Sequence, residues 1–306
     1  MPQRMRTRAR HATPPSCRWQ VPGLFLALLT LAIGCTVITP RNLQILDTWT
    51  VGRVFEHVLI IVLENQDYET VRKHPYMKYL GEQGTLFEQF YGLFHPSYPN
   101  YLAMIGGKFF GTIGDVQKDI DSKTIADLLE AKQLTWKQYA DGLPEPCFTG
   151  SRYGRYARKH VPFMSFLSIQ HDAQRCAHVV DERAFDPHHL PHYAFYSPDM
   201  NHDGHDTSLD TAAVWLKEFL TPLLANGSLM DTTLIVVTFD ESASQGGHDD
   251  NHIYTVFLGN MVKKGYVETR PYDHYNVLRT IEENFGLGTL DTQDAASSPI
   301  VHVWAK

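Results

Sequence analysis

The sequence lacks the short motifs that mark several large enzyme classes. It contains no G-x-S-x-G, H-E-x-x-H, G-x-x-x-x-G-K-S/T or G-x-G-x-x-G pattern. These motifs position a serine nucleophile, a zinc ion, a nucleotide phosphate and a dinucleotide, respectively. Their absence therefore removes the usual support for lipase-type hydrolases, zincins, P-loop proteins and dinucleotide-binding proteins. The chain also has no internal repeat and no low-complexity tract.

Excess positive charge is missing as well. The 306 residues include 27 lysines and arginines against 34 aspartates and glutamates, which gives a formal net charge of -7, and no basic block occurs in the part expected to fold. This balance argues against nucleic acid as the main partner. With 43% hydrophobic and 20% charged residues, the composition is that of a globular protein long enough for one large α/β domain.

The N-terminal segment has the pattern of a targeting sequence. Several arginines between residues 4 and 18 precede a short apolar run, Leu24 to Ile33. We expect residues 1–39 to be a signal peptide or an N-terminal anchor, 40–56 a linker, and 57–306 a single catalytic domain. The protein would then be secreted or extracytoplasmic, with a membrane tether through this segment as the alternative to cleavage.

Cysteine is scarce. Two of the four cysteines lie in the N-terminal segment, which leaves Cys147 and Cys176 for the rest of the chain. Outside the cytosol, two remaining thiols most simply form one disulfide. Two buried free thiols are the alternative.

Two apolar stretches far apart in the chain end in oxygen donors. Residues 58–63 form an uninterrupted apolar run followed by Glu64 and Asn65, and residues 233–239 are followed by Asp240 and Glu241. Runs without polar alternation are typical of strands buried on both faces of a parallel sheet. Because ligands bind at the carboxyl ends of such strands, the two ends predict one site built from distant segments. Helix caps or solvated turns are the alternative explanation.

Between and after these runs, strand and helix patterns alternate. Further strands are predicted near residues 134–139, 192–197 and 254–258, and helices near 75–84, 124–132, 208–224 and 274–285. Ser97 is predicted at or just before a helix N-terminus, because Pro99 fits a first helical turn. Residues 141–190 read as a long irregular segment with a functional role. This order predicts a three-layer α/β/α sandwich with a mainly parallel central sheet.

The remaining polar groups suit one type of chemistry. Carboxylate oxygens can hold a divalent metal ion, which lowers the pKa of a serine hydroxyl and screens an incoming phosphoryl group. Histidines can bind phosphoryl oxygens or protonate the leaving group. The chain has 16 histidines, several of them beside Asp or Asn. A serine near a helix start, two pairs of oxygen donors and several histidines make up such a set.

Six ordered blocks of the sequence resemble the phosphoesterase family, which includes bacterial and fungal acid phosphatases and phosphatidylcholine-type phospholipases C. The resemblance covers roughly residues 55 to 287 and implies a fold like that of the alkaline phosphatase superfamily. The blocks contain Glu64, Asn65 and Tyr68; His95, Ser97, Asn100 and Tyr101; Lys159, His160, Pro162 and Phe163; Pro198, Asp203, His205 and Asp206; Thr238, Asp240 and Glu241; and His274, Leu278, Arg279, Ile281 and Glu282.

The resemblance implies a role for each site residue. Glu64, Asn65, Asp240 and Glu241 would bind a divalent metal ion of unknown identity. Ser97 would be the nucleophile, would form a phosphoserine intermediate and would also touch the ion. His160 and His205 would contact phosphate, and one of them would be the general acid. His95 and His252 are further candidate phosphate contacts, with solvated turns as the alternative.

The expected function is metal-dependent hydrolysis of phosphate monoesters, with a small phosphorylated molecule or a phospholipid head group as substrate. The short interval between Asn65 and Ser97, and the end of the chain soon after the last helix, favour a compact phosphatase. A phospholipase C or other phosphodiesterase is the nearest alternative, and residues 153–166 could line the apolar channel that it needs. A non-catalytic metal- or glycan-binding surface protein is the alternative of another class, although it would not need Ser97. A plain serine esterase has less support.

Overall fold

The computed structural model of the chain describes residues 53–244 and 251–305. The expected signal peptide or anchor at 1–39 lies outside these residues, as does the expected linker except for residues 53–56. Among the described residues, no helix is both long and apolar enough to cross a membrane.

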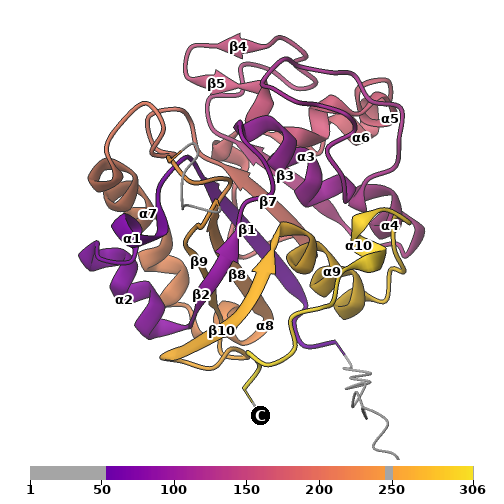
Figure 1. Ribbon diagram of the computed structural model, residues 1–306. Helices are drawn as coiled ribbons and strands as arrows, with labels where there is room; N and C mark the ends of the chain where they lie inside the picture. Colours follow the sequence, from indigo (N-terminus) through magenta and orange to yellow (C-terminus); the bar gives the residue numbers. More distant parts are fainter. Residues whose placement is uncertain (1–52, 245–250, 306) are drawn as a thin grey trace, which may run out of the picture. The chain divides into compact units, whose positions relative to one another are not determined.

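The core of the protein is an eight-stranded sheet (Figure 1). Strand β1 lies near its centre and pairs in parallel with β7 and β8, whereas β9 runs antiparallel to both of its neighbours. The sheet is therefore mainly parallel, as predicted. In spatial order its strands are β10 (Tyr266–Asp273), β2 (Thr85–Tyr91), β9 (Thr255–Leu258), β8 (Thr233–Phe239), β1 (His57–Leu63), β7 (Tyr193–Ser197), β3 (Trp136–Ala140) and β6 (Val179–Val180).

Helices cover both faces of the sheet. In Figure 1, α1, α2 and α7 lie on one side, and α3, α4, α9 and α10 on the other. The predicted three-layer α/β/α architecture is therefore confirmed. The helices are α1 (Tyr68–Val71), α2 (Pro75–Gln83), α3 (Ser97–Gly106), α4 (Ile125–Ala131), α5 (Leu167–Gln170), α6 (Ala173–Cys176), α7 (Leu209–Leu224), α8 (Gly227–Thr232), α9 (His274–Phe285) and α10 (Gln293–Ala296).

The predicted helix ends agree with the caps that the side chains form. Thr124 caps α4, and Ser208 caps α7 by accepting a hydrogen bond from the backbone N–H of Thr211. Asp273 caps α9, which ends at Gly286 in the left-handed conformation. Local signals thus determine where these helices begin and end.

The segment from residue 141 to 190 consists of short elements. It contains the hairpin β4 (Arg152–Tyr153) and β5 (Tyr156–Ala157), the 3-10 turns η1 (Arg158–His160), η2 (Pro162–Ser165) and η3 (Glu182–Ala184), and the helices α5 and α6. Cys147 and Cys176 form the expected disulfide, with Cα atoms 5.1 Å apart. The alternative of two free thiols is therefore wrong.

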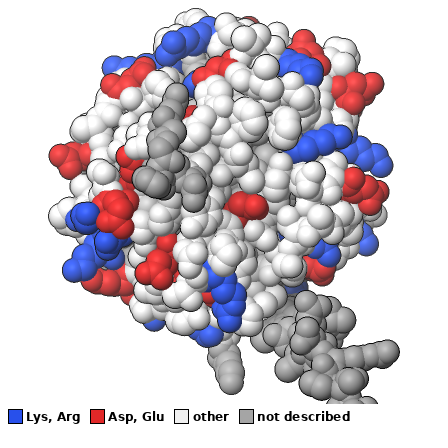
Figure 2. All heavy atoms as spheres, in the orientation of Figure 1, with Lys and Arg blue, Asp and Glu red and all other residues white. Residues whose placement is uncertain are grey.

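Charged side chains of both signs are interspersed on the face shown in Figure 2, mostly around its rim. Opposite charges mixed in this way largely cancel each other's field at a distance. This face therefore carries no large field of one sign.

A buried carboxyl pair in the helical layer gives a pH-dependent contribution to stability. The Glu282 side chain in α9 has no exposed surface, and its Oε2 lies 3.7 Å from Nη1 of Arg279, whose charge opposes the rise in pKa only in part. Burial and the negative charge of Asp294 raise the pKa of Glu282 to about 9. The folded protein thus keeps a proton that the unfolded chain releases near pH 4.5. The contribution is full below that pH and is lost as the pH rises toward 9.

We expect Glu282→Gln to stabilise the protein at pH 8 by about 1–3 kcal/mol and to change little at pH 4.5, because glutamine is neutral at both values. Urea unfolding of the variant and the wild type at the two pH values measures this difference. Equal pH dependence of unfolding in both proteins would show that Glu282 is ionised in the folded state. The exposed Glu218→Gln is the control and should match the wild type.

Candidate functional site

The two predicted strand ends are neighbours in the sheet. Strands β1 and β8 are paired in register, with Leu63 opposite Phe239, so Glu64 and Asp240 follow at equivalent positions. The backbone N–H of Asp240 donates to the Leu63 carbonyl, and that of Asn65 donates to Asp240 Oδ1 at 3.3 Å. Asn65 has a positive φ of 41°, which turns the chain out of the strand. The four predicted metal ligands therefore lie at one edge of the sheet.

Ser97 is the first residue of α3 and points at this edge. Its hydroxyl donates to Glu241 Oε1 at 2.9 Å, and its Oγ lies 3.2 Å from Asn65 Oδ1 and 3.5 Å from Glu64 Oε2. The serine is buried, with 1% of its surface exposed. The convergence that the sequence predicts is thus present in the structure.

The carboxylates of this site are crowded and cut off from water. Glu64, Asp240 and Glu241 have no exposed surface. Burial, followed by the negative charges of Glu64 and Glu241, raises the pKa of Asp240 well above its usual range. Burial also raises the pKa of Glu241. Burial acts in the same direction on Glu64, but the nearby His160 and Lys159 outweigh it and lower the pKa of that carboxyl.

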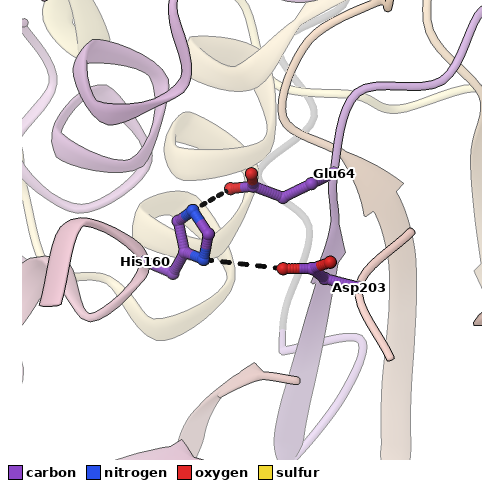
Figure 3. A group of neighbouring side chains, drawn as sticks. All are labelled: Glu64, His160 and Asp203. Carbon is purple, nitrogen blue, oxygen red and sulfur yellow. Dashed lines mark ion pairs between the residues drawn. The ribbon is translucent and has the colours of Figure 1, made fainter. Parts of the chain in front are cut away.

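A second group of possible metal ligands shares Glu64 with the group around Ser97. Figure 3 shows His160 between Glu64 and Asp203. His160 Nε2 lies 2.5 Å from Glu64 Oε1, and His160 Nδ1 lies 3.7 Å from Asp203 Oδ2. All three side chains are buried, and burial together with the charge of Glu64 raises the pKa of Asp203 to about 8. The His160 ring also stacks on Tyr101, with ring centroids 5.1 Å apart.

Buried atoms without hydrogen-bond partners test whether a cation fits here. Among the described residues, Asp240 Oδ2 and Asp203 Oδ2 are buried and make no hydrogen bond, whereas Glu64 Oε1 and His160 Nε2 face each other at 2.5 Å. A buried polar atom left unsatisfied is costly, and a buried charge more so. Oxygen and imidazole donors are ligands for divalent cations, so binding one would satisfy these atoms. The residues present fit a metal ion.

Comparison with known proteins agrees with this geometry. The model of the Phosphoesterase family matches residues 68–288. The chain belongs to the phosphoesterase family.

Relatives in the phosphoesterase family include fungal acid phosphatases. The "Acid phosphatase" of Aspergillus fumigatus is 35% identical over 263 residues, which are 81% of this chain and 58% of that protein. The "Probable acid phosphatase" of Kluyveromyces lactis is 34% identical over 79% of this chain and 61% of its own length. This chain thus spans about three fifths of the length of these two relatives. The "Phosphatidylinositol-3-phosphatase" of Mycobacterium tuberculosis is 33% identical and is covered over 83% of its length.

The solved structures that resemble this member of the phosphoesterase family support the fold. A protein in the alkaline phosphatase superfamily from Vibrio parahaemolyticus gives a TM-score of 0.57 at 14% identity, covering 82% of this chain and 72% of its own. The expected alkaline phosphatase-like fold is therefore confirmed.

The four predicted phosphate contacts have different surroundings in the structure. His160 lies inside the buried cluster, whereas His205 borders a cavity of about 360 Å³ and is held by Asp206, with its Nδ1 2.8 Å from Asp206 Oδ1. The His95 Nδ1 contacts Glu241 Oε2. The described contacts of His252 are with other groups: its Nε2 lies 2.7 Å from the Glu88 carbonyl oxygen, and its ring stacks on Tyr68 and lies against Tyr91.

Several residues that contact the site have no role that a sequence motif assigns. Asp203 is one of them, and it lies in the loop that follows β7, the strand that pairs with β1. His274 Nε2 lies 2.8 Å from the backbone oxygen of Asp240, and burial lowers the pKa of His274 to about 4, so the neutral ring can donate to that oxygen. Lys159 Nζ lies 4.0 Å from Glu64 Oε2. A strand-end rule would have pointed to Asp199, just after β7, rather than to Asp203 in the loop that follows.

Proposed function

We propose that this protein is a metal-dependent hydrolase of phosphate monoesters, of the acid phosphatase type, with Ser97 as its nucleophile. One observation carries the proposal. The Ser97 hydroxyl, at the start of α3, lies within 3.5 Å of oxygens from Glu64, Asn65 and Glu241. A metal- or glycan-binding protein has no need for a buried hydroxyl aimed at that group of oxygens.

The proposed metal ligands are Glu64, Asn65, Asp240, Glu241 and Ser97, with the cluster of His160 and Asp203 as a second position that shares Glu64. A divalent cation bound there supplies positive charge that lowers the pKa of the serine hydroxyl and screens the phosphoryl oxygens. Glu241 Oε1 already accepts the hydroxyl proton in a hydrogen bond. This contact orients the lone pairs of Ser97 Oγ for attack.

In the proposed reaction, Ser97 Oγ passes its proton to Glu241 Oε1 and forms a bond to phosphorus as the bond to the leaving oxygen breaks. His205 is the proposed proton donor to that oxygen, because it borders the open cavity and Asp206 orients its ring. His160 is enclosed between Glu64 and Asp203, so it suits binding of the phosphoryl group or the metal ion rather than proton transfer to a leaving group. Water then attacks the phosphoserine, inorganic phosphate leaves, and the serine hydroxyl is restored.

The aromatic segment from residue 153 to 166 favours a phosphatase over a phospholipase C. Tyr156, Phe163 and Phe166 are at most 1% exposed, and Phe163 stacks on Trp136 in the core. Tyr153 is exposed to solvent. The buried rings are core packing and thus do not form a channel for acyl chains. The proposed substrate is therefore a small phosphorylated molecule, with a phospholipid head group as the second candidate.

We also propose that the protein works outside the cytoplasm. The disulfide between Cys147 and Cys176 supports this location, because disulfides persist mainly in oxidising compartments. Whether the protein is free or anchored depends on residues 1–39, which the structure does not describe.

Hydrolysis assays on the purified protein test the proposed function. After dialysis against a chelator, we expect hydrolysis of p-nitrophenyl phosphate to be lost and then restored by a divalent metal, with metal content measured in parallel. Phosphatidylcholine should be a poor substrate under the same conditions. Absence of p-nitrophenyl phosphate hydrolysis with every divalent metal tried, or a preference for phosphatidylcholine, would reject the proposal.

A further inference from the structure

Lys159 supplies a permanent positive charge at the site. Among the described residues, it is the only lysine or arginine whose ion pairs reach one of the buried site carboxylates. Its side chain is 17% exposed, which means that most of it is enclosed by protein. The histidines nearby carry charge only when protonated, whereas a lysine is charged over the whole physiological range.

Asp115 fixes the position of this ammonium group. The Lys159 Nζ donates to Asp115 Oδ2 at 2.9 Å, and the backbone N–H of Tyr98 donates to Asp115 Oδ1 at 3.1 Å. Tyr98 is the second residue of α3, directly after Ser97. One carboxylate therefore ties the ammonium group to the start of the helix that carries the proposed nucleophile.

Both members of this pair also face open space. The cavity of about 360 Å³ that borders His205 is lined by Asp115 and Lys159, and by Arg152, Met200 and Asp206 among others. The ammonium group thus lies between the buried carboxylates on one side and the proposed leaving-group cavity on the other. Ser97 Oγ and Lys159 Nζ lie 3.5 Å and 4.0 Å, respectively, from the same Glu64 Oε2, so a phosphoryl group bonded to Ser97 would lie near the ammonium group.

We propose that Lys159, positioned by Asp115, binds a non-bridging oxygen of the phosphoryl group and selects monoesters over diesters. This inference rests on the proposed function. A monoester carries close to two negative charges at neutral pH, because its second pKa is about 6, whereas a diester carries one. A fixed cation therefore stabilises a bound monoester more than a bound diester. In a diester, the second ester group removes the negative charge of one phosphoryl oxygen, and Lys159 then lacks that oxygen as an ionic partner.

The ratio of monoesterase to diesterase activity tests this role. Lys159→Met keeps the length of the side chain and removes its charge. We expect kcat/KM for p-nitrophenyl phosphate to fall about 10- to 100-fold, the range of one charge-assisted hydrogen bond, while kcat/KM for bis-p-nitrophenyl phosphate changes less than about threefold. Lys159→Arg should recover part of the lost monoesterase activity. The control is Lys118→Met, a lysine of the same region that donates to the Phe110 carbonyl instead.

The position of Asp115 gives an independent test. Asp115→Asn should reduce monoesterase activity less than Lys159→Met does, and the double variant should be no worse than Lys159→Met alone, because Asp115 acts through the lysine. Thermal unfolding of each variant separates these effects from loss of fold.

The possible outcomes distinguish failure of the role of Lys159 from failure of the proposed function. Equal losses on both substrates in Lys159→Met, or no loss on either, would overturn the role of Lys159 while leaving a hydrolase that depends on Ser97. A wild-type protein that hydrolyses neither substrate with any divalent metal would overturn both. A variant whose monoesterase activity alone falls supports the proposal.

Discussion

Ser97→Ala is expected to lower kcat/KM for p-nitrophenyl phosphate by at least about ten-thousand-fold, since the variant lacks the oxygen that attacks phosphorus. The substitution removes one oxygen atom and no charge, and the partners of Ser97 keep other neighbours: Glu241 contacts His95, and the Asn65 backbone contacts Asp240. The fold should therefore persist. Steady-state kinetics with saturating metal measures the loss. Acid quenching during turnover of a radiolabelled substrate should trap label on the wild type and none on the variant.

The matched control is Ser165→Ala. Ser165 is also fully buried, and its Oγ accepts a hydrogen bond from the Tyr98 hydroxyl at 2.7 Å, but it contacts none of the proposed metal ligands. We expect its activity to stay within about threefold of the wild type once any loss of stability is taken into account. If Ser97→Ala kept a tenth or more of the activity, the covalent mechanism would be wrong, and direct attack by water would replace it.

How far the sequence predicts this site depends on the kind of signal that each residue carries. Glu64 follows an uninterrupted apolar run and Asp240 a mainly apolar one, and such runs become adjacent central strands because both of their faces are buried. Ser97 follows from the prolines that define the start of α3. Local sequence patterns are enough to predict these positions. Each pattern identifies the end of a strand or the start of a helix, and the fold brings these ends together.

His160, Lys159 and Asp115 carry no such local signal. His160 and Lys159 lie in the short turn η1, within a segment without periodicity, and Asp115 lies in a loop after α3. Their contacts depend on how two irregular segments pack against each other. No pattern of hydrophobicity contains that information, so only the family resemblance could mark His160, and nothing in the sequence marked the pairing of Lys159 with Asp115.

The two strands β2 and β10 show the same limit in the fold. Neither was predicted, and they pair with each other at one end of the sheet. In β10 the apolar Val267 is exposed and the charged Glu268 is buried, and Pro271 further weakens any strand pattern. Strands buried on both faces are easy to recognise from composition, whereas strands near an edge gain stability from pairings that the sequence does not reveal.

Asp240→Asn is expected to change activity and metal-free stability in opposite directions. The carboxylate of Asp240 is fully buried beside Glu64 and Glu241, and its Oδ2 has no hydrogen-bond partner among the described residues. Without a cation, this arrangement brings like charges together in a low-dielectric environment. An amide of the same shape removes one of these charges. In the presence of chelator, the variant should therefore be more stable than the wild type by about 1–3 kcal/mol.

A bound cation reverses this order. Ligand binding to the folded state stabilises it according to ligand concentration and affinity, so the wild type should gain stability as metal is added. The variant, which lacks one anionic ligand, should gain much less, and its kcat/KM should fall at least about a hundredfold because the serine hydroxyl is less activated. Thermal unfolding in chelator and in a series of metal concentrations, combined with kinetics, measures both effects.

Two further variants decide whether the effect belongs to the position of Asp240. Asp121→Asn, at an exposed position before α4, should change neither stability nor activity. Glu64→Gln should reduce activity but, unlike Asp240→Asn, should not stabilise the protein in chelator. The reason is that Glu64 contacts the positively charged Lys159 and lies against His160. If metal raised the melting temperature of Asp240→Asn as much as that of the wild type, Asp240 would not be a ligand. If Asp240→Asn were instead less stable than the wild type in chelator, the buried carboxylate of Asp240 would stabilise the fold without a cation. Its unsatisfied oxygen would then be no sign of a metal site.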